Sequence, residues 1–236
     1  MADQTPDALA CAARLARAFP DTRNRTALAV RGGVVRAVDA LRSCVRERGF
    51  ALPADGEHTG LVEGASDRTG LSLLGLFADA ALYRGNGSAT ICEVGFNYGL
   101  SASFFLAAYP RARVYSFDLA DKPYSSTAEA CVHAAFPGRF TLIAGDSTQT
   151  VPAAPRLGCD VAFVDGYHFH NVPFADIVNL QALSRRGALT LVDCCDMPAV
   201  YGGFLAAQRH GVVGPIVQVM TPAKGKERSV CVGSYL

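Results

Sequence analysis

A regular alternation of short apolar runs and helical segments, beginning at residue 89, is the feature that most constrains this chain. The runs are apolar on both faces, as buried parallel strands are. Helical segments follow them at the spacing of βαβ units. This alternation predicts a mainly parallel α/β sheet with strands at 90–94, 113–117, 140–144, 160–164 and 188–192, and helices at 100–108, 126–136, 148–153, 174–184 and 199–210.

Two further strands are expected at 215–220 and 228–233, joined by Pro222-Ala223-Lys224-Gly225-Lys226. Parallel strands need a long crossover connection, so a connection this short indicates an antiparallel hairpin at the edge of the sheet. The sequence therefore predicts seven strands in one structural unit.

An acidic residue stands at the end of every one of the five parallel runs. Ligands of open α/β sheets bind outside the carboxyl ends of the strands, so we expect these acids to line one crevice. Turns favour Asp in any fold, so a single acid at a strand end is weak evidence for a ligand site. Its repetition at all five strands is what supports the prediction. Such a negative crevice suits a cationic ligand, a polyhydroxyl ligand or a metal ion. The five acids are Glu93, Asp118, Asp146, Asp165 and Asp193.

The overall charge and the lack of long apolar segments argue against several classes of partner. The formal net charge is +1 over 236 residues, so we expect neither nucleic acid nor an anionic membrane as a partner. No run of about 18 consecutive apolar residues is present, which argues against a transmembrane helix. Asp3 and Asp7 interrupt the beginning of the chain, so a signal peptide is not expected.

The eight cysteines show neither Cys-x-x-Cys pairs nor the spacing of a zinc site. Several lie inside apolar runs, as buried thiols do. We therefore expect reduced cysteines and a cytoplasmic location.

The loop after the first run narrows the choice of ligand. Residues 95–99 read Gly-Phe-Asn-Tyr-Gly, with Asn97 where the dinucleotide fingerprint has the glycine that lets a pyrophosphate approach. A ligand without a pyrophosphate, such as S-adenosylmethionine, fits better. Its carboxylate suits the loop amides and a helix N-terminus. Glu93 can contact the cationic groups of S-adenosylmethionine, and Asp118 can accept hydrogen bonds from its ribose hydroxyls. An NAD-dependent oxidoreductase on a Rossmann-like fold is the first alternative.

At this point the residues resemble the class I S-adenosylmethionine-dependent methyltransferases over roughly residues 66–233. The nearest group is the catechol and caffeoyl-CoA O-methyltransferases, with relatives that methylate sugars and polyketides. The stretch from Glu93 to Ser101 is similar to the group's first motif. The resemblance implies a Rossmann-like class I methyltransferase sandwich, with cofactor contacts from Thr69, Gly70, Glu93, Gly95, Asn97, Tyr98, Gly99, Ser101, Asp118, Asp146, Ser147 and Asp165.

The stretch from Asp160 to His168 resembles the group's fourth-strand motif. The resemblance implies that Asp165 and Asp193 are ligands of a divalent metal, usually Mg²⁺, and that His168 is the base. A histidine with an ordinary pKa of about 6.5 is largely neutral at physiological pH, as a base must be. His170 is a second candidate for this role.

The chain departs from the group at the residue after the second metal aspartate. The group has Asn or Asp there, whereas this chain has Cys194, and a thiol is a poor ligand for Mg²⁺. Two alternatives stay open: Asp196 or water supplies the missing oxygen, or the site holds no metal.

These residues predict an enzyme that transfers the methyl group of S-adenosylmethionine to a hydroxyl of a small molecule. Residues 1–65 are expected to form an N-terminal helical cap over the acceptor pocket, and residues 66–236 the methyltransferase domain. Tyr167, Phe169 and Tyr201 are candidates for lining that pocket. A homodimer is left open. The second alternative is a non-catalytic, methyltransferase-like binding module, which Cys194 favours.

Overall fold

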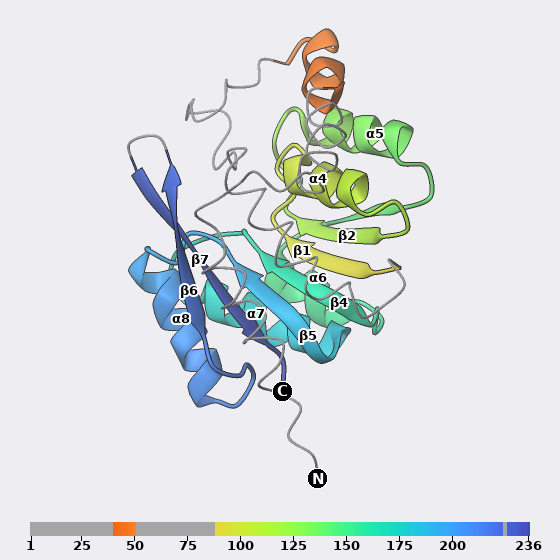
Figure 1. Ribbon diagram of the computed structural model, residues 1–236. Helices are drawn as coiled ribbons and strands as arrows, with labels where there is room; N and C mark the ends of the chain where they lie inside the picture. The colour runs from red at the N-terminus through yellow and green to blue at the C-terminus, as the bar shows by residue number, and fades with distance from the viewer. Residues whose placement is uncertain (1–39, 51–87, 224–225) are drawn as a thin grey trace, which may run out of the picture.

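A computed structural model describes residues 40–50, 88–223 and 226–236 of the chain. Seven strands form a single sheet in the order β3-β2-β1-β4-β5-β7-β6 (Figure 1). The first five strands are parallel, and β7 is antiparallel to both β5 and β6. This confirms the predicted mostly parallel seven-stranded sheet with a C-terminal antiparallel hairpin. The strands are β1 (Thr90–Val94), β2 (Arg113–Asp118), β3 (Phe140–Ala144), β4 (Cys159–Val164), β5 (Ser184–Val192), β6 (Val217–Ala223) and β7 (Lys226–Ser234).

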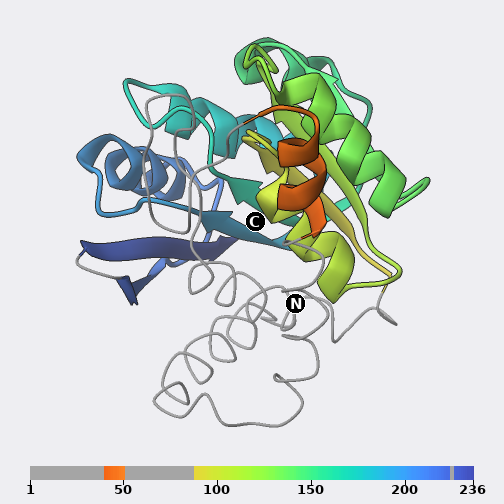
Figure 2. The same cartoon turned by 90° about the horizontal axis from the view of Figure 1, so that it is seen from above.

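Helices cover both faces of the sheet, which buries the central strands on both sides (Figures 1 and 2). On one face, α4, α5 and a helical segment at 40–47 pack against the strand residues that include Ile91 and Phe163. On the other face, α6, α7 and α8 pack against the alternate strand residues, Cys92 and Val164 among them. The helices are α4 (Leu100–Ala108), α5 (Ser125–Ala135), α6 (Ser147–Ala153), α7 (Val172–Leu183) and α8 (Pro198–Arg209).

The predicted helices and strands agree with the observed ones to within a few residues, and the larger differences have local causes. β5 begins at Ser184, whereas its predicted start was residue 188. The apolar pattern missed the first half of the strand because Arg185 and Arg186 are exposed and interrupt the apolar run. β6 continues through Pro222, which the sequence analysis placed in the connection. A proline is tolerated there because β6 is the edge strand of the sheet.

Part of the predicted cap can be compared with the structure. The helical segment at 40–47 buries Leu41 and Val45 in the core beside α4 and α5 (Figure 2). The rest of that cap and the predicted cofactor contacts at Thr69 and Gly70 lie outside the described residues.

The expectation of reduced cysteines was wrong for six of the eight. The structure joins Cys44 to Cys131, Cys92 to Cys159 and Cys195 to Cys231. The partners are 87, 67 and 36 residues apart along the chain, so no short spacing motif could indicate them. Disulfides are typical of oxidising compartments, and the argument for a cytoplasmic location from reduced thiols therefore no longer holds.

Within residues 40–50, 88–223 and 226–236, none of the helices has the length and hydropathy of a transmembrane segment.

Candidate active site

The parallel strands all end on the same side of the sheet, and the five predicted acids lie at these carboxyl ends. Glu93 is the fourth residue of β1, and Asp118 is the last residue of β2. Asp165 and Asp193 each follow a strand directly, and their amides donate to the last carbonyls of the neighbouring strands, Val94 at 2.8 Å and Val164 at 3.0 Å. Asp146 follows β3 after one intervening glycine. The five acids therefore stand at the carboxyl ends of the strands, and that they line one crevice stays a prediction.

The loop after β1 packs directly against the end of β4. Gly95 has a φ of 100°, and a Cβ placed on it would lie 2.1 Å from the carbonyl oxygen of Asp165. Both the left-handed backbone and the close approach require glycine at this position. The first glycine of the motif therefore sets the distance between the loop and the aspartate beyond β4.

Glu93 lies beneath this loop with no exposed surface. Ser116 donates a hydrogen bond to its Oε1 at 2.5 Å, and Ser101 also contacts the carboxyl group. The second oxygen, Oε2, is buried without a hydrogen-bond partner. Burial, together with the nearby carboxylates of Asp165 and Asp118, raises the pKa of Glu93 to about 8. Glu93 is thus largely protonated at neutral pH, a state that the sequence analysis did not foresee.

Asp118 holds the loop after β1 in place. Its Oδ2 accepts the backbone N–H groups of Phe96 at 2.7 Å and Asn97 at 3.0 Å, and its Oδ1 accepts that of Ala120 at 2.7 Å. A carboxylate has about four acceptor positions, so these amides use most of its capacity. The position of this acid could be predicted from the end of β2, whereas its contacts with the loop could not.

The start of α4 leaves backbone donors available. Its N-cap is Gly99, which provides no side-chain cap for the amides of the first helical turn. Asn97 has a φ of 52° and accepts a hydrogen bond from the Tyr124 hydroxyl at 2.6 Å. Tyr98 is buried in the core cluster beside α4, so its ring has a packing role. Uncapped amides at a helix N-terminus form a natural carboxylate site.

Beyond β3, Asp146 and Ser147 both have protein partners. Asp146 caps α6 by accepting the amide of Thr148 at 2.9 Å. The Ser147 hydroxyl donates to Oδ1 of Asp176 at 2.7 Å. Asp176 is fully buried in α7, and burial raises its pKa to about 6. The sequence analysis missed this residue, although it is the one charged residue of an otherwise uncharged helix.

Asp165 and His168, the two predicted catalytic residues, lie in contact with each other. Nε2 of His168 lies 3.4 Å from Oδ1 of Asp165, and their side chains are 21% and 13% exposed. Tyr167 and Phe169 flank the histidine, are mostly exposed and contact each other with ring centroids 5.3 Å apart. The ring of His170, the second candidate base, stacks against Tyr167 with centroids 6.3 Å apart. The loop after β4 thus turns His168 inward and presents two aromatic rings outward.

Asp193, the second predicted metal ligand, is buried next to Cys194. The Cys194 thiol lies 3.6 Å from Oδ2 of Asp193, within the distance of a sulfur hydrogen bond. Cys194 has a φ of 54°, an unusual backbone conformation for a residue other than glycine. In the described part of the chain, no three His, Cys, Asp or Glu side chains come together as metal ligands.

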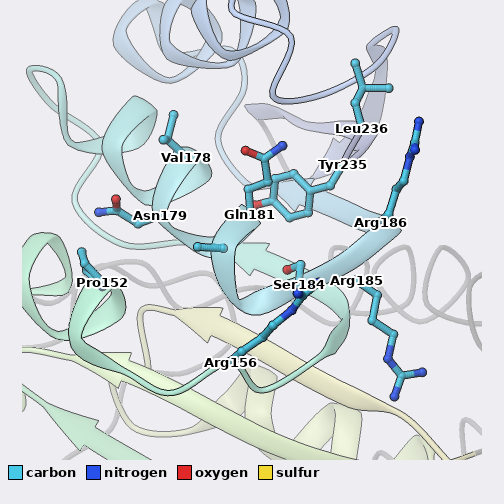
Figure 3. Close-up of a pocket in the computed structure, with 11 residues that line it drawn as sticks. Pro152, Arg156, Val178, Asn179, Gln181, Ser184, Arg185, Arg186, Tyr235 and Leu236 are labelled. Atoms are coloured by element: carbon cyan, nitrogen blue, oxygen red, sulfur yellow. The ribbon is translucent and has the colours of Figure 1, made fainter.

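A separate cavity of about 610 Å³ lies at the other end of β5, next to the end of α7 (Figure 3). Three arginines line it, Arg156, Arg185 and Arg186, and Arg185 pairs with Asp160 at 2.9 Å. Other polar groups in its wall, such as the hydroxyls of Ser184 and Tyr235, bond to backbone carbonyls. No predicted site residue lines this cavity.

The part of the chain that carries the five acids matches a known family model. Residues 92–195, which include all five acids, match the family model of a methyltransferase domain. A search of curated proteins found no significant match.

Solved structures share the fold at low sequence identity. An O-methyltransferase from Bacillus cereus in complex with SAH has a TM-score of 0.67 and 14% identity over 85% of this chain and 91% of that chain. The O-methyltransferase TomG from Streptomyces achromogenes, involved in tomaymycin synthesis and in complex with SAM, has a TM-score of 0.61 and 19% identity over 84% and 89%. The cofactor-bound protein Rv0187 from MTB has a TM-score of 0.63 and 18% identity over 100% and 99%. Residues 92–195 thus match a methyltransferase domain, and the chain shares its fold with S-adenosylmethionine-dependent O-methyltransferases of known structure.

Proposed function

We propose that this chain methylates a hydroxyl group of a small molecule with S-adenosylmethionine, and that His168, positioned by Asp165, is the base. The observation that carries the proposal is the 3.4 Å contact between Nε2 of His168 and Oδ1 of Asp165. It stands at the carboxyl end of β4, where ligands of such sheets bind. The methyltransferase match over residues 92–195 supports the same reaction class.

The residues around the loop after β1 suit the cofactor. The amides that begin α4 have no side-chain cap and can receive its carboxylate. Oε2 of Glu93 is buried without a hydrogen-bond partner next to that helix. Asp118 would share its remaining acceptor capacity with the ribose, and Asp146 and Ser147 would approach the adenine. When bound, the cofactor supplies an electrophilic methyl group on a sulfonium and leaves as a neutral thioether.

The residues at the ends of β4 and β5 do not suit Mg²⁺. This cation requires near-octahedral oxygen coordination at about 2.0–2.1 Å. Asp165 already contacts His168, and Asp193 already contacts the Cys194 thiol. We therefore assign no step of the reaction to a metal.

The protein's own groups can align the acceptor and remove its proton. Nε2 of His168 faces Asp165, and in this proposal the other ring nitrogen, Nδ1, accepts the proton of the acceptor hydroxyl. The carboxylate then stabilises the imidazolium that forms. A positioned base contributes about 10²–10⁴-fold to a rate, and alignment of the reactants about 7–11 kcal/mol.

The class of the hydroxyl acceptor stays open between a sugar, a phenol and a polyketide, and an amine is the alternative to a hydroxyl. Tyr167 and Phe169 stand on either side of the base and are 56% and 52% exposed, so they are placed to contact an acceptor. The proposal also includes an N-terminal cap formed by residues 1–65, a methyltransferase domain formed by residues 66–236, and a homodimer.

The test combines binding and turnover. S-adenosylhomocysteine should bind in calorimetry, and conversion of S-adenosylmethionine should be measured with acceptors from each of the four classes. His168→Gln should lower the maximal rate by about 10²–10⁴-fold while cofactor affinity stays within about twofold of the wild type. Asp165→Asn should lower the rate and shift its pH profile. His133→Gln is the matched control, because His133 lies on α5 with its side chain 45% exposed.

Three outcomes would contradict the proposal. An unchanged rate in His168→Gln would refute the assignment of the base. Thermal stabilisation by NAD but not by S-adenosylhomocysteine would favour an oxidoreductase. Cofactor binding without turnover on any acceptor class would favour a non-catalytic binding module.

A further inference from the structure

The two carboxylates at the ends of β4 and β5 are engaged by protein groups of their own. Oδ1 of Asp165 lies 3.4 Å from Nε2 of His168. Oδ2 of Asp193 lies 3.6 Å from the sulfur of Cys194. A divalent cation between them would have to compete with both of these contacts.

Cys194 is held in place by the backbone around it. Its φ of 54° is maintained by two neighbouring hydrogen bonds: Met197 N donates to the Cys194 carbonyl at 2.9 Å, and Cys195 N donates to the Ser229 carbonyl at 2.8 Å. The disulfide from Cys195 to Cys231 ties the same loop to β7. A loop restrained at this many points does not easily rotate to offer Mg²⁺ a different donor.

Asp196 is the candidate for the missing oxygen ligand, but its carboxylate contacts β7 and not Asp193. The hydroxyl of Ser229, on β7, lies 3.4 Å from Oδ1 of Asp196. Asp196 is also exposed, whereas Asp193 is buried. The donor set is therefore two carboxylates that already have protein partners and one thiol, a softer ligand than the oxygen donors that Mg²⁺ prefers.

We infer that this site positions its acceptor without a divalent cation, and that Cys194 is a positioning residue that holds Asp193 by a thiol–carboxylate contact. The inference deepens the proposed methyl transfer and rests on it. The proton of the acceptor goes to His168, and no divalent cation takes part in orienting the acceptor oxygen.

The test asks whether the full-length chain binds a divalent cation. Mn²⁺ is the probe, followed by electron paramagnetic resonance and calorimetry with S-adenosylhomocysteine present. The wild type should show no saturable Mn²⁺ binding below millimolar concentrations, and EDTA should leave turnover unchanged. Cys194→Asp places a carboxylate beside Asp193 and should raise the affinity for Mn²⁺ at least tenfold. Cys194→Ser keeps a donor to Asp193 without adding a carboxylate, so it should not gain Mn²⁺ affinity.

Asp196→Asn is the matched control, because Asp196 lies two residues beyond Cys194 and faces β7. Adding it to Cys194→Asp should leave the gained Mn²⁺ affinity in place. Saturable binding of Mn²⁺ by the wild type, or loss of turnover in EDTA with recovery in Mg²⁺, would overturn the inference. A Cys194→Asp chain that binds S-adenosylhomocysteine but gains no Mn²⁺ affinity would overturn it as well, because the thiol would then not be what excludes the metal.

The proposed function fails in a different way. If the wild type binds no S-adenosylhomocysteine, the methyl transfer is refuted whatever Mn²⁺ does. If it binds S-adenosylhomocysteine, methylates an acceptor and also binds Mn²⁺, the methyl transfer stands and the metal-free site is refuted.

Discussion

Replacing Glu93 with glutamine should change how the stability of the folded chain depends on pH. Glu93 is fully buried, and its pKa is raised from 4.5 to about 8 mainly by that burial. The folded chain therefore keeps this proton over a pH range in which the unfolded chain has lost it. Because the folded-state pKa is raised, the stabilisation is complete below pH 4.5 and is lost as the pH rises towards 8.

The size of the effect follows from the shift. Each pH unit between the two pKa values corresponds to about 1.4 kcal/mol, so the free energy of unfolding should fall by about 2–3 kcal/mol between pH 5 and pH 7 from Glu93 alone. Glu93→Gln is neutral throughout and can still accept the hydrogen bond from Ser116. The difference in unfolding free energy, variant minus wild type, should therefore rise by the same amount over this range.

Urea denaturation without cofactor, followed by circular dichroism at several pH values from 5 to 8, measures this difference. Contributions from other titrating groups such as Asp176 appear in both proteins and cancel. Glu129→Gln is the control, because Glu129 lies on α5 with a side chain 37% exposed, and its curve should run parallel to the wild type. If the Glu93→Gln curve also runs parallel, within about 0.5 kcal/mol, Glu93 is ionised in the folded chain and the reasoning from burial is refuted.

Three other substitutions test separate contacts. Asp118→Asn removes the charged acceptor of three backbone amides and should lower the free energy of unfolding by about 1–3 kcal/mol in urea denaturation; a loss near zero would mean that the loop does not depend on this carboxylate. Ser147→Ala leaves Oδ1 of Asp176 buried without its donor and should cost about 1–3 kcal/mol in the same assay, where equal stability would contradict the contact. Cys195→Ser should cost about 2–4 kcal/mol in non-reducing buffer, and dithiothreitol should abolish the difference if the disulfide to Cys231 is its cause.

The strands could be predicted because a strand buried on both faces leaves a local signature. β1 and β3 have the predicted bounds, and their residues need no distant partner to be recognised as apolar runs. β5 shows the limit of this signal. Its exposed first half is extended because it continues a strand whose second half is buried, and that cause is not visible at Arg185 and Arg186 themselves.

The positions of the site acids could be predicted, whereas their contacts could not. The position of Asp118 follows from the end of β2, but its hydrogen bonds to Phe96 and Asn97 depend on how the loop after β1 folds back over β2. The protonation of Glu93 depends on the depth of its burial, which is a property of the packed structure. The disulfides depend on which elements become neighbours, and residues 36 to 87 positions apart carry no mark of that.

A single backbone contact links the loop after β1 to the proposed base. Gly95 lies against the carbonyl oxygen of Asp165, and the side chain of Asp165 lies 3.4 Å from His168. Gly99, at the other end of the same loop, is also left-handed, with a φ of 85°, but a Cβ on it would meet the ring of Phe96, away from Asp165. The two glycines therefore separate effects on the loop from effects on the base.

Gly95→Ala should weaken cofactor affinity and also lower the rate at saturating cofactor, because the added methyl group must displace the backbone of Asp165. Gly99→Ala should weaken cofactor affinity by at least about tenfold through strain and overpacking, yet keep the saturating rate and its pH profile close to the wild type. Calorimetry with S-adenosylhomocysteine and single-turnover rates across a pH series measure the two quantities. If both variants lowered the saturating rate equally, the base would not depend on the Gly95 contact, and the loop and the base would have to be coupled through the cofactor instead.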